Sequence, residues 1–179
     1  MPLALFALTI GAFAIGTTEF VIVGLVPTIA QQLSISLPSA GLLVSIYALG
    51  VAIGAPVLTA LTGRMPRKQL LLALMVLFTA GNVLAWQAPG YETLILARLL
   101  TGLAHGVFFS IGSTIATSLV AKEKAASAIA IMFGGLTVAL VTGVPFGTFR
   151  SAFWLAGNVP RGIDSGGDCA YQQSDSGAE

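Results

Sequence analysis

Three ionisable side chains interrupt the long apolar stretches of this sequence. Glu19 lies in GTTEFVIVG, and Arg98 and His105 lie in LILARLLTGLAHGVFF. An ionisable group at membrane depth is costly, so each of these residues is a functional candidate that needs a partner. A carboxylate near a guanidinium and an imidazole can load and release a proton. These residues therefore predict proton-handling chemistry inside a membrane.

The composition places the chain among membrane proteins. Of its 179 residues, 56% are hydrophobic and 8% are charged, whereas a soluble domain averages about 25% charged residues. The net charge of +1 does not suggest nucleic-acid binding, and the single cysteine, Cys169, excludes an intrachain disulfide and a cysteine metal cluster. The sequence contains no Walker A stretch, metal-ligand cluster or Ser–His–Asp set. We expect an all-α membrane protein that is not an enzyme and binds neither metal nor cofactor.

Five apolar stretches are long enough to cross a bilayer, which takes about 20 residues in a helix. They cover residues 3–29, 39–62, 69–88, 93–120 and 125–149. The separators QQLSISLP, GRMPRK, APGYE and AKEK are too short for a soluble domain. We therefore expect the helices to be antiparallel neighbours in one bundle that occupies residues 1–149.

Lysine and arginine are confined to alternate loops of this bundle. Arg64, Arg67 and Lys68 lie between the second and third stretches, and Lys122 and Lys124 lie between the fourth and fifth. The other two loops contain neither residue type. Because short cytoplasmic loops are enriched in lysine and arginine, we expect the N-terminus to be cytoplasmic.

The rise of about 1.5 Å per helical residue gives the depth of each ionisable group. Glu19 is expected roughly 12–15 Å below the outer end of its helix, and Arg98 roughly 8 Å below the outer end of the fourth. His105 lies two turns deeper than Arg98 on the same face. Glu19 can therefore reach either residue if the two helices are neighbours. Two structural alternatives stay open: a static Glu19–Arg98 pair that joins two helices, and a His105 that only hydrogen-bonds to a neighbouring helix.

Glycine spacing predicts close helix packing, because small residues four apart let helix backbones approach. Three pairs have this spacing: Gly50 and Gly54, Gly102 and Gly106, and Gly143 and Gly147. In the fifth stretch Gly135, Gly143 and Gly147 share one face, and Pro145 lies between the last two. A proline there frees a backbone carbonyl and bends the helix. We expect this helix to act as a hinge or a seal.

Four stretches within residues 1–149 carry a resemblance to a known family: TEFVIVGLVPTIA, GRMPRK, LILARLLTG and GLTVALVTGVPFG. They are similar, in order, to the first helix, basic loop, fourth-helix motif and fifth-helix antiporter motif of bacterial drug/proton antiporters. This twelve-helix group of the major facilitator superfamily includes arabinose-efflux-like permeases. In the resemblance Arg98 is the buried arginine of helix four, and Arg64, Arg67 and Lys68 match the cations of the loop. Gly63 replaces the usual acidic residue, so the resemblance gives only weak support for a charge latch in that loop.

The resemblance implies export of a small molecule across the bacterial inner membrane by alternating access, driven by inward proton flow. The substrate would be a drug, a sugar or a related metabolite, and helices one and four would line the central cavity. The family builds its pathway between two six-helix halves, so the five helices are expected to form an incomplete N-terminal half. The alternative is a membrane fragment that does not transport and is inert or only interacts with another membrane protein.

Residues 150–179 lose the apolar character and end in GIDSGGDCAYQQSDSGAE. We predict that this tail is out of frame and disordered. Read one base later, the last two bases of the Trp154 codon and the first of the Leu155 codon encode glycine. The next five codons can then encode Trp, Arg, Glu, Thr and Phe, a stretch typical of the family between helices five and six. The alternative is a genuine short periplasmic tail.

Overall fold

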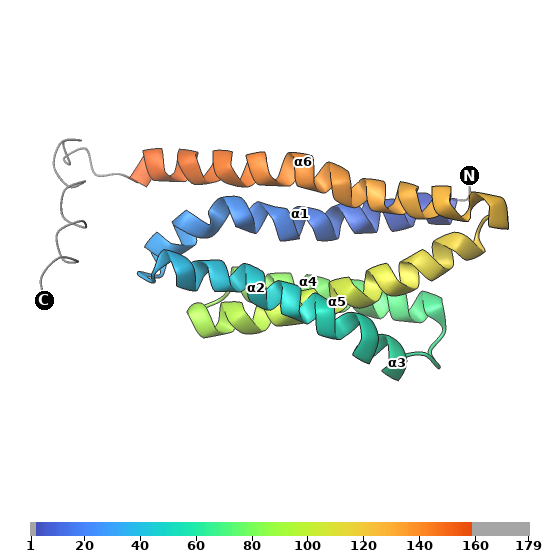
Figure 1. Ribbon diagram of the computed structural model, residues 1–179. Coiled ribbons are helices and arrows are strands. Elements are labelled where there is room, and N and C mark those ends of the chain that lie inside the picture. The colour runs from blue at the N-terminus through green and yellow to red at the C-terminus, as the bar shows by residue number, and fades with distance from the viewer. Residues whose placement is uncertain (1–2, 159–179) are drawn as a thin grey trace, which may run out of the picture.

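Five long helices form a bundle in the computed structural model, which describes residues 3–158, with side chains through residue 149 (Figure 1). The helical elements are α1 (Leu3–Gln32), α2 (Leu37–Ile53), η1 (Gly54–Leu58), α3 (Thr59–Leu61), α4 (Arg67–Trp86), α5 (Tyr91–Ser118), η2 (Lys122–Lys124) and α6 (Ala125–Asn158). Over the described range, five segments are long and apolar enough to cross a membrane. The predicted all-α membrane fold is confirmed.

Local features explain where the second membrane segment begins and why its middle departs from a regular α-helix. Ser36 caps α2, because its hydroxyl oxygen accepts a hydrogen bond from the Ser39 amide at 3.2 Å. The helix therefore begins two residues before the predicted start. Further along, α2 passes into the π-helical turn η1, which contains Pro56. A proline lacks the amide hydrogen that an α-helix needs, and the wider π turn accommodates this defect.

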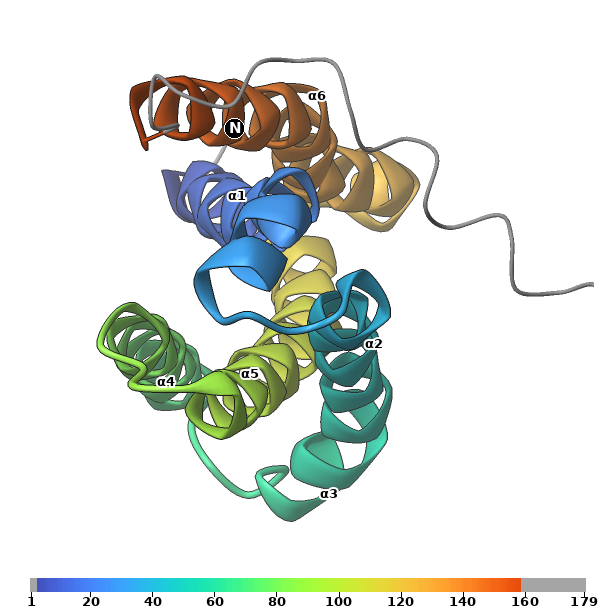
Figure 2. The same cartoon turned by 90° about the vertical axis from the view of Figure 1, so that its left-hand side faces the viewer.

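The centre of the bundle is α5. In its most apolar window 61% of the residues are buried, compared with 22% in each of the other four segments. Consecutive long helices run in opposite directions, as expected (Figure 1). The most extensive contacts, however, join α1 with α6 and α2 with α5, and α4 packs on the other side of α5 (Figure 2). Neighbours along the chain are thus not always the main packing partners.

Glycines lie where these helices touch. A Cβ added to Gly102 would meet the Tyr47 carbonyl oxygen of α2, and one added to Gly147 would meet the Val21 carbonyl oxygen of α1. Both contacts are with backbone atoms, so neither position has room for a side chain. The glycine spacing therefore predicted close helix packing correctly.

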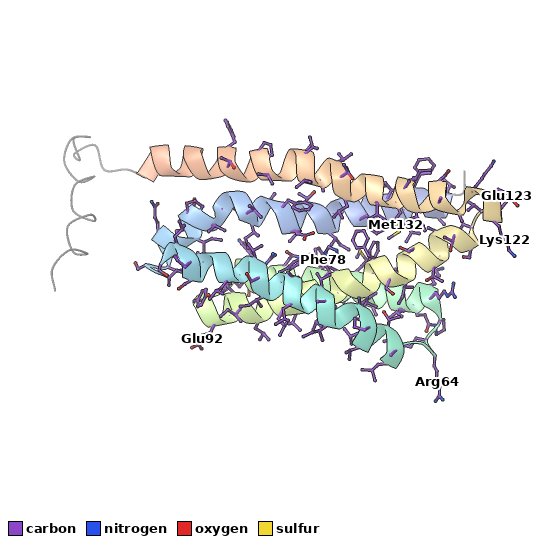
Figure 3. The ribbon with its side chains drawn as sticks, viewed as in Figure 1. Arg64, Phe78, Glu92, Lys122, Glu123 and Met132 are labelled. Carbon is purple, nitrogen blue, oxygen red and sulfur yellow. The ribbon has the colours of Figure 1, made fainter. Side chains whose placement is uncertain are left out.

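Unlike Glu19 and Arg98, the charged side chains labelled in Figure 3 lie at the two ends of the bundle. Arg64, Lys122 and Glu123 lie at one end and Glu92 lies at the other, while Phe78 and Met132 point into the interior (Figure 3). The buried core around Phe78 and Met132 is made of residues from α1, α4, α5 and α6. This separation of charge from the apolar middle is the arrangement expected of a bundle that crosses a bilayer.

The predicted out-of-frame tail begins at residue 150. Helix α6 continues to Asn158. Residues 159–179, including Cys169, lie outside the described residues, so the frameshift and the disorder stay predictions.

Candidate functional site in the membrane interior

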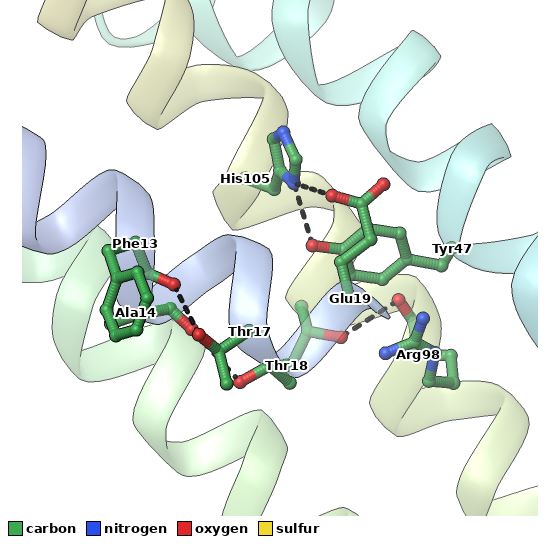
Figure 4. Close-up of polar contacts among 9 residues, drawn as sticks. Phe13, Ala14, Thr17, Thr18, Glu19, Tyr47, Arg98 and His105 are labelled. Carbon is green, nitrogen blue, oxygen red and sulfur yellow. Dashed lines mark hydrogen bonds and ion pairs between the residues drawn. The ribbon is translucent and has the colours of Figure 1, made fainter. Parts of the chain in front are cut away.

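Glu19 of α1 faces His105 of α5 in the interior of the bundle (Figure 4). The distance from the Glu19 carboxylate oxygen Oε2 to His105 Nδ1 is 3.6 Å. The Glu19 side chain is 26% exposed and that of His105 is 9% exposed. The acidic group is therefore accessible on one side, while its imidazole neighbour is enclosed. Of the two partners that the sequence left open for Glu19, His105 is the one in contact.

Tyr47 of α2 is a third member of the site, and it is not among the site residues predicted from the sequence. Its hydroxyl lies 2.7 Å from His105 Nδ1 in a buried hydrogen bond, and the residue is only 1% exposed. One signal was available in the sequence. Tyr47 precedes Gly50 by three residues, on the face through which α2 packs closely against Gly102 of α5.

Arg98 lies on the face of the Tyr47 ring and makes no ion pair with Glu19 in the described part of the chain. Its guanidinium carbon is 4.0 Å from the ring centroid, within the range of a cation–π interaction. Its Nε donates a long hydrogen bond of 3.4 Å to the Leu43 carbonyl oxygen. Its Nη2 is buried without a hydrogen-bond partner in the described residues. Tyr47 therefore holds this cation, and the Glu19 carboxylate does not.

Phe109 fixes the orientation of the imidazole. The His105 ring packs on the Phe109 ring with centroids 4.6 Å apart, and Phe109 packs in turn on Phe133 of α6. Tyr47 of α2, Phe109 of α5 and Glu19 of α1 therefore contact His105, and Phe133 of α6 packs on the Phe109 ring behind it. The four main packing partners of the bundle all contribute to the position of this ring.

A cavity of about 310 Å³ lies beside the site, between α1, α4 and α5. Its polar lining includes Thr17, Thr18, Asn82, Arg98 and Thr101. The hydroxyls of Thr17 and Thr18 donate to carbonyl oxygens of their own helix, at Phe13 and Ala14 (Figure 4). They can therefore offer only acceptor lone pairs to a molecule in the cavity.

The basic loop residues are not part of this buried site. Arg64, Arg67 and Lys68 are all exposed, and Arg67 is the first residue of α4. Within the described residues they make no ion pair.

The antiporter-like stretch of α6 packs on α1. Gly135, Gly143 and Gly147 are buried, whereas Pro145 is exposed. The helix continues through Pro145 without interruption. The shared glycine face is thus a contact surface, and its action as a hinge or a seal stays a prediction.

No three His, Cys, Asp or Glu side chains gather into a possible metal site within residues 3–158. The site consists of one carboxylate, one imidazole, one phenol and one guanidinium.

Residues 8–159 match the model of a protein family that is described as the Major Facilitator Superfamily. The chain belongs to this family. Its members are transporters, not enzymes, which confirms the predicted family and the absence of enzymatic activity.

Two bacterial relatives are especially similar to the chain. An uncharacterized transporter of the family from Bacillus subtilis, YtbD, is 60% identical over 146 residues, which are 82% of this chain and 37% of YtbD. The inner membrane transport protein YdhP of Escherichia coli is 54% identical over 155 residues, or 87% of this chain and 39% of YdhP.

A third relative, the chloramphenicol resistance protein of Streptomyces lividans, is 36% identical over 161 residues, which are 86% of this chain and 41% of that protein. The chain thus spans about two fifths of the length of these relatives.

Proposed function

We propose that the chain is the N-terminal part of a proton-coupled transporter that exports small molecules by alternating access. The contact between Glu19 and His105 carries this proposal, because it places an acidic group and a basic group 3.6 Å apart inside a membrane bundle. A half-buried carboxylate that is still accessible on one side can take up a proton from that side. His105 offers a second position for the same proton.

Arg98 serves this site as a fixed positive charge. It stays on the Tyr47 ring and contributes its field to the interior without donating to Glu19. A carboxylate that is not tied into an ion pair with arginine can change its protonation without first breaking that pair. This arrangement supports a proton-carrying role for Glu19 over the static Glu19–Arg98 pair.

The proposed substrates are drugs, sugars or related metabolites. The name of the Streptomyces lividans relative, chloramphenicol resistance protein, supports a drug-like compound. The proposed location is the bacterial inner membrane, and the name of YdhP supports it. The proposed orientation has the N-terminus in the cytoplasm, since Arg64 and Lys122 lie at the same end of the bundle (Figure 3).

A chimaera tests the proton role in a complete transporter. Residues 3–149 replace the matching segment of YdhP, and a compound that the chimaera exports is selected by growth protection, beginning with chloramphenicol. Proton release on addition of that compound is then measured in proteoliposomes. Glu19→Gln should abolish proton release, whereas Glu92→Gln, which changes an exposed acid at the end of the bundle, should not. Unchanged release in Glu19→Gln would refute the proton role.

A second function is favoured by the length of the chain relative to its relatives. Five helices make up less than one six-helix half of the family architecture, and the chain spans about two fifths of each relative. We propose that the 179-residue chain alone inserts into the membrane without transporting. Cells that express it alone should gain no export of the compound that the chimaera exports. Export by the chain alone would overturn this second proposal.

A further inference from the structure

We infer that Tyr47 is a positioning residue that sets which ring nitrogen of His105 carries the proton. It thereby decides whether Nδ1 faces Glu19 as a hydrogen-bond acceptor or as a donor. The inference rests on the proposed function, because it assigns the control of proton exchange between Glu19 and His105. Tyr47 itself need not exchange a proton with the solvent.

Two oxygen atoms compete for His105 Nδ1. The Tyr47 hydroxyl lies at 2.7 Å and the Glu19 carboxylate oxygen lies at 3.6 Å. A neutral imidazole carries one proton, so Nδ1 is either an acceptor or a donor and cannot satisfy both neighbours in the same way. Because its distance is shorter, the phenol makes the stronger hydrogen bond with this nitrogen (Figure 4).

The buried position of Tyr47 selects the direction of this hydrogen bond. His105 is the hydrogen-bond partner of the Tyr47 hydroxyl among the described residues. If Nδ1 donated to the phenol oxygen, the phenol hydrogen would be left unpaired in a residue that is 1% exposed, which is costly. The phenol therefore donates to Nδ1, and the ring proton lies on Nε2.

Two arrangements of the site contain the same number of protons. In the first, the phenol donates to Nδ1 of a neutral His105, and the carboxyl group of Glu19 holds the proton. In the second, that proton has moved to Nδ1, which gives an imidazolium facing an ionised Glu19. Tyr47 stabilises the first arrangement, since its O–H needs an acceptor. Removing the hydroxyl should favour the second.

The other groups around His105 do not offer a competing hydrogen bond. Among the described residues, the ionisable side chains that face the pair are Tyr47 from α2 and Arg98 from α5, and the Arg98 guanidinium lies over the Tyr47 ring. Phe109 packs on the imidazole, and the uncharged Phe133 of α6 packs on Phe109. The proton position on His105 is thus controlled by Tyr47 and Glu19.

The sequence offers an unusually clean probe, because His105 is the one histidine in the chain. The 179-residue chain is labelled with ¹⁵N-histidine, purified in lipid nanodiscs with a histidine-free affinity tag, and studied by NMR at neutral pH. In the unmutated chain the Nδ1 signal should have the shift of an unprotonated nitrogen. In Tyr47→Phe most of that intensity should move to the protonated position.

Two further variants distinguish the effect of losing the Tyr47 hydroxyl from a general disturbance of the fold. Tyr91→Phe removes a hydroxyl that donates to the Ser39 carbonyl oxygen, and it should leave the His105 signals unchanged. Tyr47→Phe combined with Glu19→Gln should restore the unprotonated Nδ1, because glutamine has no acidic proton to transfer to Nδ1 and its amide can donate a hydrogen bond to that nitrogen. Such rescue by a donor at position 19 is not expected from a residue that only fills space.

Two results would overturn the inference. One is a protonated Nδ1 in the unmutated chain, which can be seen even if Tyr47→Phe does not fold. The other is a folded Tyr47→Phe chain whose His105 signals match those of the unmutated chain. Both readouts are independent of transport. If Glu19→Gln leaves proton release intact but the NMR result is as expected, the proposed function fails while the role of Tyr47 in setting the tautomer stands.

Discussion

Adding a single methyl group to Gly135 should weaken the contact between α6 and α1. A Cβ at this position would clash with the Thr9 carbonyl oxygen and would lie 3.1 Å from the Phe13 amide nitrogen. Ordinary contact begins at 3.4 Å and both partners are backbone atoms, so the two helix backbones would have to separate locally. This separation would also stretch the hydrogen bond of 3.3 Å from the Thr9 hydroxyl to the Ile131 carbonyl oxygen.

Gly134 provides the matched control. A Cβ at this position meets nothing within 4 Å. Gly134→Ala and Gly135→Ala gain the same helix propensity, about 1 kcal/mol, so the difference between them isolates the packing effect. Overpacking of a tight contact typically costs about 1–3 kcal/mol. We therefore expect Gly135→Ala to be less stable than Gly134→Ala by that amount.

The assay is reversible unfolding of both variants in mixed micelles. The fraction of sodium dodecyl sulfate is raised in steps, and the loss of structure is followed by circular dichroism. The two free energies of unfolding are then compared at the same micelle composition. Equal stabilities, within about 0.5 kcal/mol, would show that α1 and α6 do not approach as closely as the structure places them.

Two further predictions concern Arg98 and the membrane orientation. Arg98→Ala should destabilise the chain by about 2 kcal/mol, through loss of the buried cation–π contact. Adding Glu19→Gln should not rescue the stability measured in micelles, and a clear rescue would mean that the two residues pair. In a cysteine-free background, a cysteine at Arg64 should resist an impermeant thiol reagent added to intact spheroplasts, whereas one at Gly90 should react. The reverse pattern would refute a cytoplasmic N-terminus.

The number and the approximate positions of the helices could be predicted from the sequence, because the thickness of the bilayer sets how many apolar residues a span needs. The fourth span was expected over residues 93–120 and is observed at Tyr91–Ser118. At the start of α2, the cap that Ser36 provides decides where the helix begins. The π turn around Pro56 was not predicted, because an apolar pattern does not distinguish it from an α-helical turn.

The site could be predicted only in part. The cost of burying ionisable groups identified Glu19, Arg98 and His105, and spacing along α5 placed the last two on one face. The choice between His105 and Arg98 as the neighbour of Glu19 depends on a residue of another helix. The Tyr47 ring occupies the space beside Arg98, and a tyrosine in an apolar span gives little indication of such a role. Long-range packing of α2 on α5 decides this point.

The most direct test of the account compares two modes of transport in the same proteoliposomes, using the chimaera and its exported compound. In one, the labelled compound exchanges across the membrane without a pH gradient. In the other, an imposed pH gradient drives its accumulation. If Glu19 carries the proton, Glu19→Gln should keep the exchange and lose the gradient-driven accumulation. Accumulation at the unmutated level in Glu19→Gln would contradict the account.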